Sequence, residues 1–158
     1  MVSNFKKFKW SITLKKIMKL SIPAIILVIV GILLLVGPWT FAPVCEVGGM
    51  YVKTATGMNL PMPCGWTARA ELGVGALTIL AGVMLAVSKS NETKRMIGII
   101  GIALGILTIL FPLYITKTCA LADHPCNLLT KPFLVLLGIV AIAVSCWVIY
   151  DAQKEEIP

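Results

Sequence analysis

The segment GILLLVGPWTFAPVC occupies residues 31–45, and a related segment, GILTILFPLYITKTC, occupies residues 105–119. Both begin with Gly-Ile-Leu, carry a proline at the eighth position and end in cysteine, so they match at an offset of 74 residues. A second match follows in each half, where Pro63-Cys64 and Pro125-Cys126 stand before another apolar run. The repeat predicts a duplicated unit, in which one apolar helix, a loop with two cysteines and a second apolar helix follow one another.

Composition indicates a membrane protein. Of the 158 residues, 58% are hydrophobic and only 13% are charged, which is too little charge to cover a soluble globule of this size. Four apolar runs approach the ~20 residues that cross a bilayer. The predicted fold is all-α and integral to the membrane, a four-transmembrane-helix bundle from two tandem parallel-topology helix hairpins. Its spans are predicted at residues 20–36, 70–87, 96–115 and 133–150.

Lysine and arginine collect on one side of the predicted bundle. Six lysines precede the first span, and Lys89, Lys94 and Arg95 lie between the second and third. Because short basic loops remain in the cytoplasm, we predict a multi-pass protein of the bacterial cytoplasmic membrane with both termini cytoplasmic and both cysteine loops outside. The net charge of +7 suits anionic lipid headgroups, and no nucleic-acid motif accompanies it.

The spans and the charges together divide the chain into segments. A basic cytoplasmic segment precedes the first hairpin, a cytoplasmic loop joins the two hairpins, and a cytoplasmic tail follows the second. The predicted bounds are 1–19 for the N-terminal segment, 20–87 for the first hairpin with its outer loop at 38–66, 88–95 for the cytoplasmic loop, 96–150 for the second hairpin with its outer loop at 116–132, and 151–158 for the tail.

The spans contain almost no ionisable residues, which disfavours a stand-alone ion-coupled transporter. Glu71 is the exception, near the outer end of the second span. We expect it at a solvated helix end, where Arg69 or lipid headgroups could pair with it. Together with Trp66, these two residues form a candidate interaction surface on the outer face.

Glycines recur in the spans at spacings that permit close helix packing. Gly101 and Gly105 form a GxxxG pair in the third span, with Gly98 on a nearby face, and Gly73 and Gly75 lie in the second span. Two interpretations stay open for these glycines. They allow either internal packing of the bundle or contact with a partner in the membrane.

Four of the five cysteines lie in the outer loops, which predicts two disulfides in an oxidising compartment. If each half descends from one unit, the equivalent bridges are Cys45–Cys64 and Cys119–Cys126, although pairing between the loops also remains open. Cys146 lies alone in the fourth span, where we expect a small apolar packing residue.

Two chemical alternatives compete with a structural role for these cysteines. A thiol oxidoreductase normally uses Cys-x-x-Cys, whereas the spacings here are nineteen and seven residues. Handling of a soft metal or haem would use sulfur and imidazole donors. The weak candidates for that chemistry are Met62, Cys64 and His124; no catalytic residue, metal site or cofactor is predicted.

The chain resembles an uncharacterised bacterial family of four-helix membrane proteins, domain of unknown function 4418. The resemblance extends from about Val30 to Ile149 and rests on the run MPCGWTARAELG at residues 62–73, followed by Cys119, Cys126, Lys131-Pro132 and Gly138. The family resemblance implies no established reaction. The resemblance implies a protein partner instead, since similar proteins look like accessory proteins of ABC exporters of the macrolide-exporter type.

These observations predict a non-catalytic accessory or regulatory subunit of a membrane transport complex, with an ABC permease as the expected protein partner and membrane lipids around it. The chain has no G-x-x-x-x-G-K-[ST] motif, no Ser-His-Asp or HExxH pattern and no carboxylate pair. The alternatives are a membrane thiol-disulfide oxidoreductase that uses the outer-loop cysteines and a protein that handles a soft metal or haem.

Overall fold

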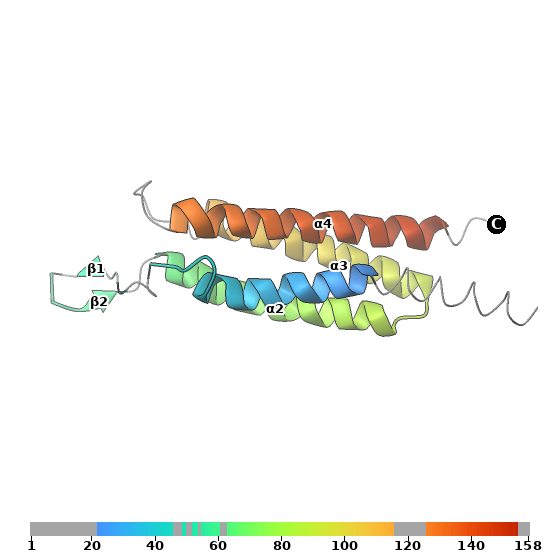
Figure 1. Ribbon diagram of the computed structural model, residues 1–158, viewed down its shortest axis with the longest axis horizontal. Helices are drawn as coiled ribbons and strands as arrows, with labels where there is room; N and C mark the ends of the chain where they lie inside the picture. The colour runs from blue at the N-terminus through green and yellow to red at the C-terminus, as the bar shows by residue number, and fades with distance from the viewer. Residues whose placement is uncertain are drawn as a thin grey trace, which may run out of the picture.

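The computed structural model describes residues 22–45, 49, 52–53, 55–60, 63–115 and 126–154. Within these residues, four helices are long and apolar enough to cross a membrane, and they lie alongside one another as a bundle (Figure 1). The predicted all-α fold with four apolar spans is therefore confirmed. The spans are Ile22–Trp39, Cys64–Val87, Asn91–Ile115 and Asn127–Lys154.

The helices extend beyond the predicted spans. The first span is α-helical over residues 22–36 and ends in a 3-10 turn at Gly37–Trp39. Helix α2 covers Pro63–Val87, and α3 covers Asn91–Leu110 and continues as a π-helical turn at Phe111–Ile115. A second π-helical turn, Cys126–Thr130, leads into α4 at Lys131–Lys154.

Helical structure thus continues into the predicted loop segments 38–66, 88–95 and 116–132. Hydropathy detects the part of a helix that lies in hydrocarbon, whereas a helix continues into polar sequence as long as its backbone hydrogen bonds are satisfied. Between α2 and α3 only Ser88, Lys89 and Ser90 are non-helical, and Ser90 has the extended backbone expected of an N-cap residue.

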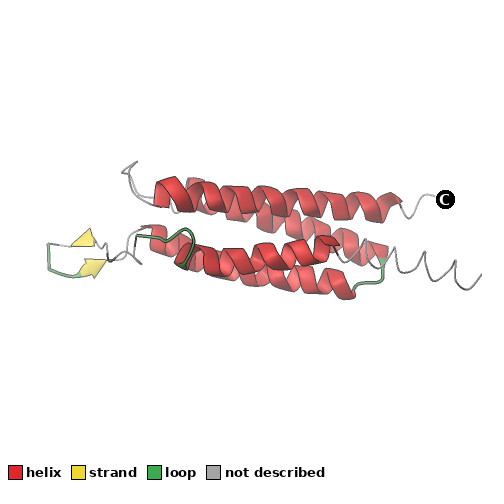
Figure 2. Cartoon of the chain, viewed as in Figure 1, coloured by secondary structure: helices red, strands yellow, loops and turns green. Residues whose placement is uncertain are grey.

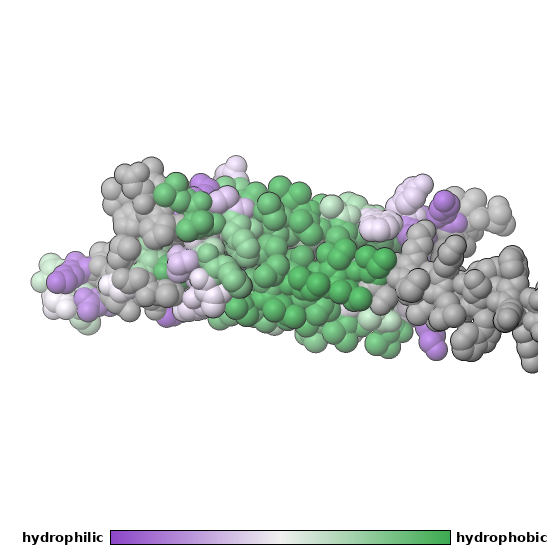
Figure 3. Space-filling view, viewed as in Figure 1, coloured by the Kyte–Doolittle hydropathy of each residue, from purple (hydrophilic) through white to green (hydrophobic). Residues whose placement is uncertain are grey.

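The bundle has two distinct ends. The first span begins, α4 ends and α2 turns into α3 at one end, which we call the turn end (Figure 1). At the opposite end, the loop end, the first span and α3 end and α2 and α4 begin, and Cys45 and Cys64 lie there. A continuous apolar band covers the visible face between them, and the hydrophilic residues lie toward the ends (Figure 3). This distribution is the one expected for a bundle that crosses a bilayer.

Consecutive helices pair through close glycine contacts. A Cβ on Gly31 of the first span would lie 2.8 Å from the carbonyl oxygen of Gly75 in α2. A Cβ on Gly105 of α3 would lie 2.9 Å from the carbonyl oxygen of Gly138 in α4. Only glycine permits two helix backbones to approach this closely, so each half of the chain forms an antiparallel helix hairpin.

The two halves bury equivalent positions. At the offset of 74 residues, Gly31 corresponds to Gly105, and both are buried where they cross the next helix. The second helices correspond at an offset of 63 residues, which pairs Gly75 with Gly138. The same register holds for every buried position between Glu71 and Leu85 of α2, each of which matches a buried position of α4. The repeat seen in the sequence is therefore a repeat of packing.

The difference between the two offsets places 11 additional residues in the first loop. That loop contains a short antiparallel hairpin of β1 (Val52–Lys53) and β2 (Asn59–Leu60), which extends beyond the helices (Figure 2). Gly57, in the turn between the strands, has a φ of 78°, a backbone conformation that favours glycine. This hairpin was absent from the sequence-based prediction, because strands of two residues leave no alternating pattern.

The core lies where the two halves meet. Leu34 of the first span, Leu104 of α3 and Leu134 of α4 belong to one buried apolar cluster. Near the loop end, the Thr130 hydroxyl donates a buried hydrogen bond of 2.9 Å to the carbonyl oxygen of Ala42. This contact connects the start of the second half's last helix to the first half's loop, so both halves contribute to the surface at the loop end.

Candidate functional site

The first cysteine pair lies in a small buried cluster at the loop end. Cys45 and Cys64 are each 1% exposed and pack with Val44 and Ala68. Helix α2 positions Cys64 in its first turn and Ala68 one turn later. No disulfide joins the cysteines whose side chains are described, which are those at positions 45, 64 and 146. The predicted Cys45–Cys64 bridge therefore stays a prediction, with both partners placed in one cluster.

Several predicted site residues lie outside the described part of the chain. Cys119, Met62 and His124 belong to this group, and for Cys126 only the backbone is described. The Cys119–Cys126 bridge and the weak metal candidates stay predictions for that reason. Within the described residues, no group of three or more His, Cys, Asp and Glu side chains could hold a metal ion.

Glu71 corrects the prediction of a solvated helix end, because its side chain is fully buried. The residue lies on the same face of α2 as Ala68 and Val74, between the cysteine cluster and the apolar core. Neither carboxylate oxygen has a hydrogen-bond partner among the described residues. A buried ionised carboxylate needs hydrogen-bond donors or a cation, and the described side chains supply neither.

The geometry of the α-helix explains why Arg69 does not pair with Glu71. Residues two positions apart project in different directions from a helix. Arg69 is exposed, and its guanidinium carbon lies 5.5 Å from the centroid of the Trp66 ring, which is a cation–π contact. The three predicted outer-face residues therefore separate into an exposed Trp66–Arg69 pair and a buried acid.

The predicted packing glycines also separate into two groups. Gly98, Gly101 and Gly105 of α3 all face α4, where a Cβ would lie close to Ile149, Ser145 and Ile142, respectively. Gly75 faces the first span, as described above. These four glycines pack inside the chain.

Gly73 differs from the packing glycines in its surroundings. It is exposed, and a Cβ built on it would meet nothing within 4 Å among the described residues. A glycine inside a helix costs about 0.5–1 kcal/mol relative to alanine, and packing among the described residues gives no reason for a glycine at this position.

The turn end holds a buried lysine within the predicted cytoplasmic loop 88–95. Lys94 of α3 is 4% exposed, and its Nζ donates a hydrogen bond of 3.1 Å to Oδ1 of Asn91. The helical spacing of three residues between them is the signal that would have predicted this contact, since such positions are neighbours on a helix.

Comparison with known families identifies the chain's relatives. The profile of the domain of unknown function DUF4418 matches residues 27–151. The chain belongs to the DUF4418 family. No curated protein and no solved structure matches it. The match begins within the first span and ends within α4 of this DUF4418 protein, and it includes the buried cysteine cluster and Glu71.

The loop end of this DUF4418 protein therefore combines two kinds of feature. Its interior contains buried thiols and a buried carboxylate, which are inaccessible to a substrate in this arrangement. Its exterior contains the Trp66–Arg69 pair, and Gly73 follows one turn further along α2. The exposed features are the ones that can contact another molecule without a rearrangement of the fold.

Proposed function

We propose that this DUF4418 protein is a non-catalytic accessory subunit of a membrane transport complex, an ABC exporter of the macrolide-exporter type, and that α2 contacts the permease. Support comes from the exposed stripe of α2, which we define as Trp66, Arg69, Gly73, Leu77 and Leu80. All five are exposed and lie three or four residues apart, so they form one continuous helix face.

Gly73 is the observation that carries the proposal. Lipid provides no hydrophobic driving force for association between helices, so small residues promote contact by allowing backbones to approach. Gly73 leaves such open space at the centre of the exposed stripe. The second half provides the comparison, because it carries Leu136 at the equivalent position, and that leucine is 60% exposed.

The neighbours of Gly73 differ between the halves in the same way. Trp66 and Arg69 correspond to Leu129 and Pro132 near the start of α4. Tryptophan and arginine are enriched at protein interfaces, where one supplies contact area and the other directed hydrogen bonds. The first half therefore carries interface-type residues at positions where the second half carries the apolar residues Leu129, Pro132 and Leu136.

The orientation in the membrane belongs to the same proposal. The turn end carries Lys89, Lys94, Arg95 and Lys154, and six lysines precede the first span in the sequence, so we assign this end to the cytoplasm of a bacterial cell, together with both termini. The loop end then faces outward. In this orientation the Trp66–Arg69 pair would meet the permease at the outer membrane boundary.

Redox catalysis is less well supported than an accessory role. Exchange between thiols and disulfides requires access of an attacking thiolate to sulfur. Cys45 and Cys64 are each only 1% exposed, so an external substrate would require the loop end to open.

The direct experiment is purification of the chain at native abundance from its own membrane in a mild detergent, followed by identification of the proteins that accompany it. The proposal predicts a stoichiometric permease with an ATP-binding subunit or domain. Recovery of the chain alone, or with thiol-redox partners instead, would contradict the accessory role.

A further inference from the structure

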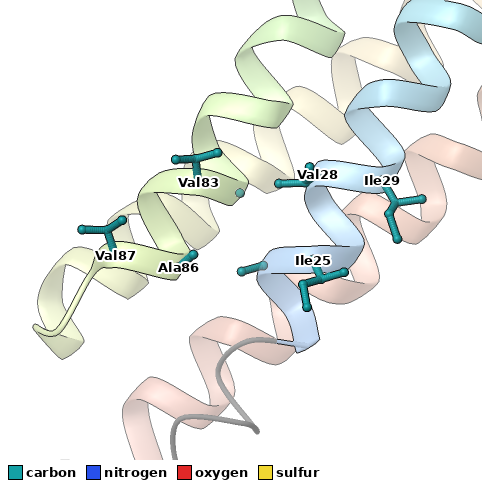
Figure 4. A pocket seen from close by; sticks show the side chains of 8 residues that line it. Ile25, Val28, Ile29, Val83, Ala86 and Val87 are labelled. Atoms are coloured by element: carbon teal, nitrogen blue, oxygen red, sulfur yellow. The ribbon is translucent and has the colours of Figure 1, made fainter.

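An apolar groove of about 230 Å³ lies between the first span and α2 near the turn end (Figure 4). Aliphatic side chains from both helices line it, and the groove offers no hydrogen-bonding side chain. The labelled lining residues are Ile25, Val28, Ile29, Val83, Ala86 and Val87. A ligand held here must be apolar over the whole length of the groove.

Small residues create this groove. Gly82 brings the two helices close together, because a Cβ on it would lie 2.8 Å from Cγ2 of Val28 and 3.0 Å from the carbonyl oxygen of Ala24. Ala24 and Ala86 then supply only methyl groups at the same level. The larger side chains at either side form the walls, and the space between them stays open.

The second half lacks this arrangement at its equivalent position. Ala24 corresponds to Gly98, and Ala86 corresponds to Ile149. The Ile149 side chain packs on Gly98, since a Cβ on that glycine would lie 2.6 Å from its Cγ1. The isoleucine thus occupies the space that the alanine leaves open. The groove is a specific feature of the first half and does not follow from the helix crossing alone.

The groove opens outward from the bundle. Ile25 and Val87 at its rim are 53% and 74% exposed. Because both helices span the membrane, the medium that reaches this rim is lipid. The groove is smaller than the roughly 300–1,000 Å³ of a pocket for a drug-sized ligand. It fits part of a single chain better than a whole molecule.

Lysines that adjoin the two groove helices in the sequence favour anionic lipids. Lys89 is exposed two residues beyond Val87, and Lys15, Lys16 and Lys19 precede Ile22 in the sequence. No acidic residue occurs in residues 1–21. Clusters of basic residues beside a span attract anionic headgroups.

We propose that this groove binds one acyl chain of an anionic phospholipid, whose phosphate lies at the turn end beside Lys89. This inference goes beyond the proposed function and does not depend on it.

The test uses the purified full-length chain in detergent, with native mass spectrometry as the readout. Phosphatidylglycerol and phosphatidylcholine with identical acyl chains serve as probes. We expect one phosphatidylglycerol to bind more tightly than phosphatidylcholine. Ala86→Ile, which introduces the residue of the second half, should weaken binding by about tenfold, or about 1.4 kcal/mol. Lys89→Gln should remove the preference between the two lipids.

Two further variants provide matched controls. Ala143→Ile makes the same change at an exposed position of α4 and should leave binding unchanged. Ile149→Ala should open the equivalent space over Gly98 and add a second bound lipid. Helix content by circular dichroism verifies the fold of each variant. The proposal is overturned if wild type binds both lipids equally, or if Ala86→Ile binds phosphatidylglycerol as tightly as wild type.

Discussion

Glu71 of α2 and Leu134 of α4 occupy equivalent positions in the two halves, and both side chains are fully buried. Leu134 belongs to the apolar core. Glu71 places a carboxyl group, without a hydrogen-bond partner among the described residues, at the corresponding level of the other half. This is the clearest departure from the internal symmetry, and it provides a test of whether the acid serves the fold.

Replacement of the acid by the residue of the second half should not harm the fold. In thermal unfolding of the purified protein, we expect Glu71→Leu to leave the free energy of unfolding unchanged or to raise it by about 1 kcal/mol or more. Replacement of buried charged groups by apolar residues of similar volume is often neutral or stabilising. The reverse change, Leu134→Glu, should destabilise by several kcal/mol. A large loss of stability in Glu71→Leu would show that the carboxyl has a structural partner.

The glycines at the helix crossings should be intolerant of larger side chains in the chain alone. In Gly105→Leu, the new Cβ would lie 2.9 Å from the carbonyl oxygen of Gly138, so the two backbones must separate. We expect a loss of at least about 1–3 kcal/mol, the usual cost of overpacking, measured as a lower midpoint of thermal unfolding in detergent. Unfolding at the wild-type midpoint would contradict the described contact between α3 and α4.

The burial of Cys45 and Cys64 in one cluster favours the predicted disulfide between them. Peptide mapping of non-reduced protein from the membrane should recover Cys45 linked to Cys64 and Cys119 linked to Cys126. Loss of the first bridge in Cys45→Ala/Cys64→Ala should cost about 2–4 kcal/mol. Cys146→Ala is the control and should cost little, because Cys146 is exposed on α4. The expectation that Cys146 packs inside the bundle was therefore wrong. A link from Cys45 to Cys119 would reject this pairing.

The orientation is tested by chemical labelling in whole cells. In a cysteine-free background, a single cysteine at Ala55, between β1 and β2, should react with a membrane-impermeant thiol reagent. A single cysteine at Ser90, before α3, should react only after the membrane is permeabilised. Both positions are exposed in the structure, so a difference reports the side of the membrane. The opposite labelling pattern would reverse the assignment of the two ends.

The spans and the repeat could be predicted from the sequence because both depend on local pattern. Apolar length specifies a membrane helix, and the shared Gly-Ile-Leu, proline and cysteine positions reveal the duplication. The β1–β2 hairpin could not be predicted in this way, since its strands are too short to show alternation.

The burial of Glu71 was predicted incorrectly for a different reason. Distance from the end of a span suggested contact with water, but burial also depends on which face of the helix meets the second half. Alignment of α2 with α4 predicts the burial of Glu71, because the equivalent residue is then Leu134. The same alignment pairs Ala86 with Ile149 and so reveals the groove. The repeat is thus more informative when its packing register is known.

The proposed contact between the exposed stripe around Gly73 and a permease is measured by comparing Gly73→Leu with Ala143→Leu. Both variants place leucine at an exposed helix position, and the second half already carries the exposed Leu136 at the position equivalent to Gly73. Each is purified in parallel with wild type, and the co-purifying permease is quantified per chain, after equal thermal stability has been verified. We expect Gly73→Leu to lose most of the permease and Ala143→Leu to retain it. Full recovery of the permease with a folded Gly73→Leu would exclude contact through this stripe.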